Sequence, residues 1–365
     1  MTKTLTAKHR DDPRQRNLAI MVGIAVLMVI LAALSLWNQS REMAPHYSPH
    51  PFFPNLEQEV RDVAHVRLQS RKGMIDVVFK PEKGWVIANH DDYPADFDAL
   101  RQTVLGMAQL ETIEPKTARA DWLHYVDLGA PPQGKGILIS LQGEDGKKLA
   151  SLVTGKNEDI GDPSGATGLF VREPDTTQTW LVRSTFEPKT DIGDWLQKHV
   201  LDVDRSRIQE VDVEPSSGPS YSARRLKPTD DDFSLLNIPA GREIAYAGAA
   251  DGVGAAIMGF TFDDVRPAKN FDFSDQGHAS RLITRTFDGL TVTVATIQQG
   301  QNYWATIATE ADPGKPLAQK EAREISTRTT GWAYKLPQYK GQLFMTSLES
   351  LLKPPASSQP SKPAQ

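Results

Sequence analysis

Apolar and polar residues alternate along two similar stretches of the chain, 63–69 and 208–214. Such alternation is typical of a β-strand that has one buried face. The two stretches begin 145 residues apart, and each is followed by a second strand-like run, at 75–80 and 220–227. The pattern therefore predicts that one pair of strands occurs twice.

A helix is predicted after an aromatic-led strand in each copy, at 85–87 and 233–236. Apolar residues then recur at intervals of three or four, which is the spacing of one helix face. They are Phe97, Leu100, Val104 and Met107 in the first copy, and Ala249, Val253, Ile257 and Phe260 in the second. Each helix is expected to leave through an acidic turn with a proline, at 110–116 and 262–269.

Further strand-like runs complete each copy, at 136–142, 148–155, 168–173 and 179–183 in the first and across 281–309 in the second. Asp288-Gly289 and Gln299-Gly300 are hairpin signals within the latter. Short polar turns between strands favour antiparallel sheets, so the predicted fold class is α+β with two related modules. We place these modules at 60–190 and 208–352, joined by a connecting helix at 191–207, with an amphipathic helix ending near Leu352.

Residues 18–37 are twenty consecutive positions without a charge. A helix of that length crosses a hydrocarbon core of about 30 Å. A buried helix of a soluble core is rarely apolar on every face, and the apolar region of a cleaved signal peptide spans only about 7 to 15 residues. We therefore expect an uncleaved transmembrane anchor.

The charges that flank this stretch predict its orientation. Five Lys or Arg residues precede it, whereas Arg41 is the only one in the twenty residues that follow. Because an excess of Lys and Arg stays in the cytoplasm, residues 1–17 are expected to form a cytoplasmic tail and the bulk of the chain to lie outside. Residues 38–59 are rich in proline and are predicted to form a spacer, and 353–365 a disordered tail.

Composition narrows the function classes. The formal net charge is −5, with 41 basic and 46 acidic residues, so no overall positive field exists to hold a nucleic acid. The chain of 365 residues contains no cysteine, which excludes disulfides, thiolate metal ligands and a cysteine nucleophile.

An acidic cluster directly precedes the first predicted helix. We interpret it as the start of that helix, with Pro94 in the first turn, where its missing N–H would be unbonded in any case. Asp96 and Asp98 then face the positive end of the helix dipole, and Asp91 or Asp92 can cap the helix.

Two other interpretations of this cluster remain. A metal site would need His90, Asp91 and Asp92 to converge, although consecutive side chains of an extended segment point to opposite sides. The alternative function is an envelope hydrolase that uses Asp91, Asp92 and Asp96 as acid and base. The second copy lacks the acids at the corresponding position, which favours the structural interpretation.

The remaining candidate motifs favour structural roles. The loop at 155–168 carries Asn157, Asp159 and Asp162 and could hold calcium, but it lacks EF-hand spacing. Residues 252–259 resemble a phosphate-binding loop, yet Ile257 stands where a glycine is required. Several histidines are scattered without ligand spacing: His65, His124, His199 and His278. We assign no catalytic, cofactor-binding or metal-binding residue.

The chain resembles a bacterial family known as domain of unknown function 4340. The motifs that carry the resemblance are "YPADFDALRQTVLGMAQLETI", "YVDLGAPPQGKGILISL", the "LVTG", "GLFVRE" and "TWLV" strands, and "DWLQKHVLDVDRSRIQEVDV". It extends over roughly residues 60 to 350. The resemblance implies a single-pass protein of the bacterial inner membrane whose bulk is periplasmic, associated as an auxiliary component with ABC-type transport systems of the gliding-motility kind.

The functional expectation is a non-enzymatic accessory or binding subunit without cofactors. Its expected partners are the cytoplasmic membrane and a membrane-protein complex such as an ABC-type permease, and not nucleic acid. The motifs that carry the resemblance are structural, so no site residue follows from them.

Overall fold

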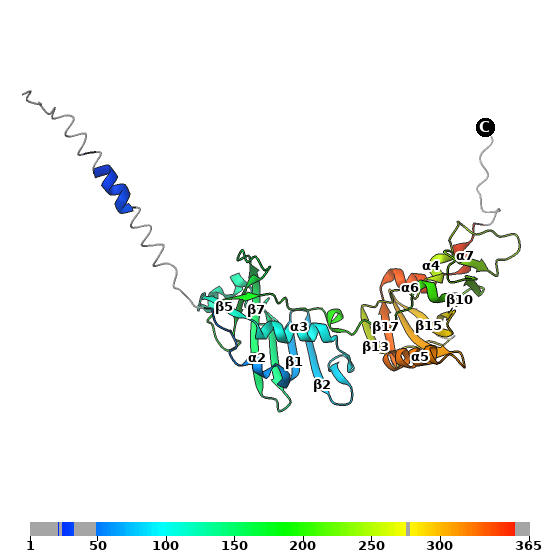
Figure 1. The fold of residues 1–365 in the computed structure, drawn as a ribbon, viewed down its shortest axis with the longest axis horizontal. Helices are drawn as coiled ribbons and strands as arrows, with labels where there is room; N and C mark the ends of the chain where they lie inside the picture. The colour runs from blue at the N-terminus through cyan, green and yellow to red at the C-terminus, as the bar shows by residue number, and fades with distance from the viewer. Residues whose placement is uncertain (1–20, 22–23, 33–48, 275–277, 355–365) are drawn as a thin grey trace, which may run out of the picture.

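The computed structural model describes residues 21, 24–32, 49–274 and 278–354. Two antiparallel sheets with packed helices form two modules that follow each other along the long axis of the molecule (Figure 1). The first module contains the elements from α2 to β9, and the second those from η4 to α7. The predicted α+β arrangement is confirmed.

Nine strands form the sheet of the first module within the described residues, in the order β4-β3-β2-β1-β6-β7-β8-β9-β5. These strands are β1 (Val63–Ser70), β2 (Gly73–Lys80), β3 (Gly84–Ile87), β4 (Tyr93–Pro94), β5 (Glu111–Pro115), β6 (Ile137–Gly143), β7 (Lys148–Glu158), β8 (Thr167–Arg172) and β9 (Trp180–Ser184). The runs predicted from alternation are thus strands.

The described part of the second module has eight strands in the order β12-β11-β10-β14-β15-β16-β17-β13. They are β10 (Ile208–Glu214), β11 (Tyr221–Arg224), β12 (Ser234–Leu236), β13 (Asp264–Pro267), β14 (Ser280–Thr286), β15 (Leu290–Gln299), β16 (Asn302–Ala311) and β17 (Trp332–Leu336). Apart from β4, the order matches the first module strand for strand.

A shared irregularity supports the duplication. The register between β1 and β6 shifts between Val63 and His65, and that between β10 and β14 shifts between Ile208 and Glu210. Both positions differ by the 145 residues found in the sequence. A bulge re-aims the strand that carries it, so its presence at the same place in both sheets indicates one inherited pattern.

Helices cover the sheets at different places in the two modules. The α-helices described beyond residue 48 are α2 (Leu56–Glu59), α3 (Phe97–Ala108), α4 (Asp251–Gly254), α5 (Pro316–Thr329), α6 (Gln338–Phe344) and α7 (Leu348–Leu351), and the 3-10 helices are η1 (Val60–Asp62), η2 (Ala120–Val126), η3 (Ile192–Trp195), η4 (Arg205–Arg207) and η5 (Ala268–Asn270). The predicted second-copy helix is reduced to the four residues of α4. Its module is covered instead by α5, which the sequence analysis did not predict, and by α6.

Three other predictions were wrong. The turns expected at 110–116 and 262–269 contain the edge strands β5 and β13, which pair with β9 and β17. The connecting helix expected at 191–207 consists of the short η3 and η4 with non-helical chain between them. The closing helix is divided into α6 and α7, ending at Leu351.

The second half of the predicted spacer is part of the first module. Pro51 forms a β-bridge with Glu111, and the backbone N–H of Phe52 donates to the carbonyl of Leu110. Leu56 is buried in α2. Apolar burial therefore fixes residues 49–59 onto the sheet, which corrects the expected boundary at 59.

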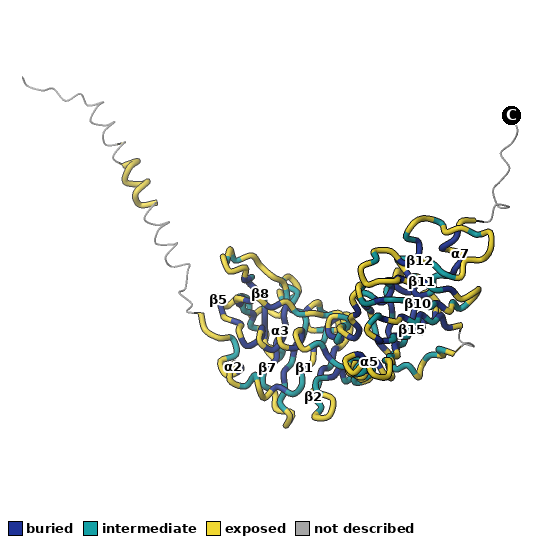
Figure 2. The backbone as a smooth tube through the Cα atoms, turned by 45° about the vertical axis from the view of Figure 1, so that its right-hand side comes forward, coloured by how far each residue is buried: buried dark blue, intermediate teal, exposed yellow. Residues whose placement is uncertain are grey.

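One cluster of buried apolar residues continues through both modules, from Leu56 to Leu352. Figure 2 shows buried strands inside each sheet and exposed connections between them. A smaller cluster lies around Ile297 and Trp304, where the ring of Phe271 lies 4.5 Å from that of Trp304.

Among the residues that the structure describes, no helix is long and apolar enough to cross a membrane. Most of the predicted anchor at 18–37 lies outside the described residues. The parts of it that are described, Met21 and residues 24–32, are helical and exposed.

Replacing Gly106 with alanine should destabilise the first module. A Cβ at this position of α3 would lie 2.6 Å from the Cβ of Phe186, which is buried. We expect Gly106→Ala to lower the free energy of unfolding by about 1–3 kcal/mol through overpacking, although glycine to alanine usually stabilises a helix. Urea unfolding of the intact chain measures this change.

Gly252→Ala is the matched control, because its new Cβ would meet Leu343 at an ordinary 3.5 Å. An unchanged or raised stability of Gly106→Ala would contradict the tight contact between α3 and Phe186.

Candidate functional site

A groove opens between the outer side of α3 and the elements beside it. Phe97 is 61% exposed and Leu105 is 38% exposed, although Leu100 and Val104 of the same helix are buried. The groove has a volume of about 350 Å³ and is lined by Val60, Arg61, Val63, Trp85, Phe97, Leu100, Arg101, Val104 and Leu105. The sequence analysis placed Phe97 on the buried face, which is wrong.

Phe97 and Leu105 are uncovered because they lie outside the face of α3 that packs on the sheet. Its inner face packs tightly on the sheet around Leu100, Val104 and Met107. Phe97 begins the helix and Leu105 follows two turns later on a neighbouring stripe, so both point away from that face. Exposed large apolar residues gathered in one place indicate an interaction surface.

Two arginines flank the groove. Arg101 lies 3.2 Å from the carboxylate of Asp98, with both side chains largely exposed. Arg61 has no ion-pair partner in the part of the chain that the structure describes. No acidic side chain lines the groove itself. The site therefore combines apolar contact area with the charge of Arg61 at its rim, beside the Arg101–Asp98 pair.

The first two acids of the cluster form a turn between β3 and β4. Asp91 and Asp92 have φ values of 55° and 60°, which aspartate tolerates better than most residues. The Tyr93 N–H donates to the carbonyl of His90, so Asp91 and Asp92 are the two central residues of a tight turn with left-handed backbone.

The carboxylates of this cluster have separate structural partners. Lys80 and Lys83 donate to Asp92 at 2.7 and 3.0 Å, and these hydrogen bonds lower the pKa of the Asp92 carboxyl. Asp96 is the N-cap of α3 and accepts from the Ala99 N–H at 2.7 Å. Pro94 lies in β4, so the prediction that it begins the helix and that Asp91 or Asp92 caps it was wrong.

His90 faces the second module rather than its acidic neighbours. Its Nε2 atom lies 2.7 Å from Oδ1 of Asp264 in β13, and the imidazole is 7% exposed. The contact is an ion pair only when the imidazole is protonated. Burial by itself raises the pKa of Asp264, but the contacts with His90, the Val265 N–H and Arg266 outweigh it and leave the pKa below its ordinary value.

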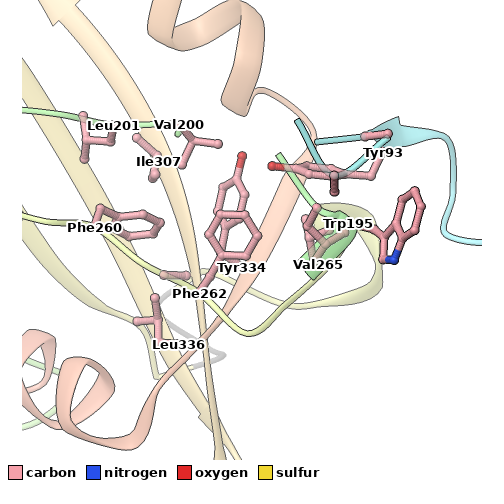
Figure 3. Packing of buried hydrophobic residues seen from close by; sticks show 14 of the residues in the cluster. Tyr93, Trp195, Val200, Leu201, Phe260, Phe262, Val265, Ile307, Tyr334 and Leu336 are labelled. Carbon is pink, nitrogen blue, oxygen red and sulfur yellow. The ribbon is translucent and has the colours of Figure 1, made fainter. Parts of the chain in front are cut away.

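Tyr93 joins the two modules beside this pair. Its ring lies 4.9 Å from that of Trp332 and 6.2 Å from that of Phe262, both in the second module. Its hydroxyl donates to the carbonyl of Gln197 at 2.9 Å, and Figure 3 shows the hydroxyl end of Tyr93 pointing toward Tyr334. Burial raises the pKa of both tyrosine hydroxyls. The arrangement is that of a packed junction.

The other sequence candidates also have structural contacts. Asp159 and Asp162 accept backbone N–H groups of their own loop, and Arg183 donates to Asp162 at 2.5 Å, which holds the pKa of Asp162 well below its usual range. A Cβ at Gly254 would lie 2.4 Å from the ring of Phe233, so this glycine permits close packing.

Neither a metal cluster nor convergent histidines emerge from these contacts. Within the described ranges, no three His, Asp or Glu side chains gather closely enough to hold a metal ion. His65 contacts Asp76 at 2.5 Å, and His124 stacks on Tyr125 with ring centroids 3.9 Å apart. The groove beside α3 is lined mainly by apolar side chains, and we take it as the candidate binding site.

A profile of a family described as domain of unknown function 4340 matches residues 85–276, which is 192 of the 365 residues. The chain belongs to this family. Searches of curated proteins and of solved structures give no significant match. The family match begins at Trp85 in the groove and includes α3, the segment 191–207 and β13. The part shared with the DUF4340 family thus contains Tyr93, His90 and Asp264, all at the junction between the modules.

Sequence reasoning missed the groove and the junction for different reasons. The spacing correctly predicted that Phe97 belongs to a helix. The sequence does not show which faces of that helix are covered by other elements. The contact of His90 with Asp264 spans 174 positions. The isolated aromatic at the start of α3 was the available signal for the groove.

The contacts of the Asp264 carboxylate at the junction between the modules should make stability depend on pH. Because the folded-state pKa of Asp264 is lowered, its carboxylate stabilises the fold above about pH 4, and this contribution is lost as the pH falls through the folded value. We expect Asp264→Asn to be less stable than the wild type at pH 7 and to lose less stability on acidification to about pH 3. Urea unfolding followed by tryptophan fluorescence at each pH measures both.

Asp232→Asn, at an exposed position of a loop in the second module, is the control and should follow the wild-type pH profile. Parallel profiles for Asp264→Asn and the wild type would show that Asp264 does not contribute in this way.

Proposed function

We propose that the protein is a non-enzymatic, membrane-anchored, extracytoplasmic accessory subunit that binds a membrane-protein partner through the groove beside α3. The observation that carries the proposal is the gathering of exposed Phe97 and Leu105 between Arg61 and Arg101. Membership of the DUF4340 family fits this proposal without specifying the partner.

The exposure of the N-terminal helical residues supports the anchor. Ile24, Leu27, Met28, Val29 and Ile30 are all 48% or more exposed, which no single covered face would allow. A helix with apolar residues on every side is stable when a hydrocarbon environment surrounds it. The flanking charges then set residues from about 40 onward outside the cytoplasm.

The occupant of the groove is an extracytoplasmic segment of an integral membrane protein, with apolar side chains and at least one carboxylate. The apolar lining accepts the former, and the guanidinium groups of Arg61 and Arg101 pair with the latter. Burying an exposed phenylalanine at the centre of such a contact contributes about 2 kcal/mol or more. A concave site of this size can enclose protruding side chains of a partner, whereas a flat partner surface would not enter it.

An ABC-type permease is the class of partner that we propose. An accessory subunit tethered by one helix meets partners in the same membrane at high local concentration, so a modest groove is sufficient. The family resemblance to auxiliary components of such transport systems motivates this choice of class.

The alternative of an envelope hydrolase receives no favourable observation. Asp92 is held by two lysines and Asp96 caps a helix, whereas an acid–base pair needs carboxyl groups with different environments directed at one substrate. We therefore do not propose an enzymatic reaction.

A topology experiment tests the anchor. We expect alkaline phosphatase fused to the C-terminus to be active and a cytosolic β-galactosidase fusion at the same point to be inactive, because the C-terminus lies outside. The intact protein should also stay in the membrane pellet after carbonate washing. Activity of the cytosolic fusion alone, or release by carbonate, would contradict the anchor.

A site-specific crosslinker tests the groove. We expect benzoylphenylalanine at position 97 to form adducts with a membrane-embedded protein in intact cells, because position 97 lies in the contact. Sequencing of the adduct should give an extracytoplasmic segment with apolar residues and Asp or Glu. A double Arg61→Glu, Arg101→Glu variant should reduce the adduct by about tenfold or more, because it reverses the rim charge.

Position 317 provides the matched control, since Leu317 of α5 is 83% exposed in the other module. Crosslinks that are equal at 97 and 317, that join only lipid, or that persist in the charge-reversed variant would rule out the proposed site. Unchanged urea unfolding of the variants separates loss of contact from loss of folding.

A further inference from the structure

A second exposed apolar surface lies on η2, away from the groove. Trp122 is 48% exposed and Tyr125 is 64% exposed, and no residue of η2 is buried. Their rings lie 6.4 Å apart at 83°, and the guanidinium of Arg119 lies 5.1 Å from the ring of Trp122. We call Arg119, Trp122, His124 and Tyr125 the aromatic tip.

The polar ends of these aromatic side chains are available for other partners. Within the described residues, neither the Trp122 indole N–H nor the Tyr125 hydroxyl forms a hydrogen bond. The charges around them are nearly balanced, because Arg119 pairs with Asp121 at 2.8 Å. Lys156 adds a positive charge, its amine donating to the Tyr125 carbonyl at 2.8 Å without a carboxylate partner among the described residues. An apolar body with a free polar end suits a boundary between lipid and water.

The aromatic tip lies near the place where the described globular part begins. Val126, at the end of η2, lies against Gly155 of β7. From β7 the sheet leads through β8 and β9 to β5, which meets Pro51. Four strand spacings and about four residues along a strand give a separation of about 23 Å between Gly155 and Pro51. Figure 1 shows β5 and β7 together at this end of the first module.

We propose that the aromatic tip contacts the headgroup region of the phospholipid bilayer that holds the anchor, an inference that rests on the proposed membrane anchoring. Eleven residues, 38–48, separate the predicted span from the described chain and reach at most about 40 Å. The tether therefore keeps the tip at high local concentration near the lipid surface. Perpendicular rings offer no flat platform for a sugar, so the geometry favours lipid over a glycan.

The absence of cysteine allows a single spin label in the intact chain. Ala120→Cys places it at the exposed start of η2 without removing an aromatic residue, and Leu226→Cys, at an 81% exposed site of the second module, is the reference. The labelled full chains are inserted into nanodiscs of phosphatidylethanolamine and phosphatidylglycerol. Collision of the label with a water-soluble nickel chelate is then measured.

We expect collision at position 120 to be several-fold lower than at 226, because a surface-bound tip shields the label. The double change Trp122→Ser, Tyr125→Ser should restore it, and circular dichroism should confirm that the variant is folded. Equal collision at 120 with and without the two aromatic residues would overturn the contact. Shielding of the label that appears only when soluble peptidoglycan fragments are added, and not with lipid alone, would also overturn the lipid contact.

Insertion into nanodiscs is scored separately by co-elution of protein and lipid. A chain that fails to insert contradicts the anchor and with it the lipid contact. A chain that inserts but leaves the label in water contradicts the lipid contact alone, and the anchor stands.

Discussion

Burial of Tyr93 between the modules is the contact on which the arrangement of the whole molecule depends. Tyr93 belongs to the first module by sequence, yet its ring packs on Trp332 and Phe262 of the second. Each large side chain removed from water in this way contributes about 1.5–3 kcal/mol. Together with Trp195, which is also fully buried, it joins two cores that could otherwise separate. The cluster of buried apolar residues therefore continues from one duplicated sheet to the other.

The two copies share their strands and differ in their helices, so the helix that forms the groove in the first module is much shorter in the second. Strand order and the bulge near the start of β1 and β10 are shared, because sheet pairing depends on long-range register that tolerates little change. In the first module α3 spans twelve residues and leaves Phe97 outside. In the second, α4 has four residues, and α5 and α6 pack on the sheet. The groove thus depends on the helix in which the two modules differ, while the strand order of their sheets is shared.

The sequence predicted the strands well because alternation reports burial on one face, a local property. It misassigned β5 and β13, since each is short, carries acids and a proline, and becomes a strand only through its edge position beside β9 and β17. The helix predicted at 191–207 was wrong for another reason. Trp195, Leu196 and Val200 are buried at the junction between the modules, and their spacing along the sequence resembles that of one helix face. Helix α5 was overlooked because its inner face is built from the small residues Ala318 and Ala322. Neither the groove nor the ion pair of His90 could be predicted, because both depend on packing between distant segments.

The position of both proposed surfaces on the first module follows from the tether. With the proposed anchor, the first described residue lies within about 40 Å of the membrane, so even contacts of low intrinsic affinity near that end would be occupied. The second module, at the other end of the molecule in Figure 1, gains no such advantage. An aromatic tip resting on lipid would fix the rotation of the first module about its anchor, and this would present the groove in one orientation to a neighbour in the same membrane.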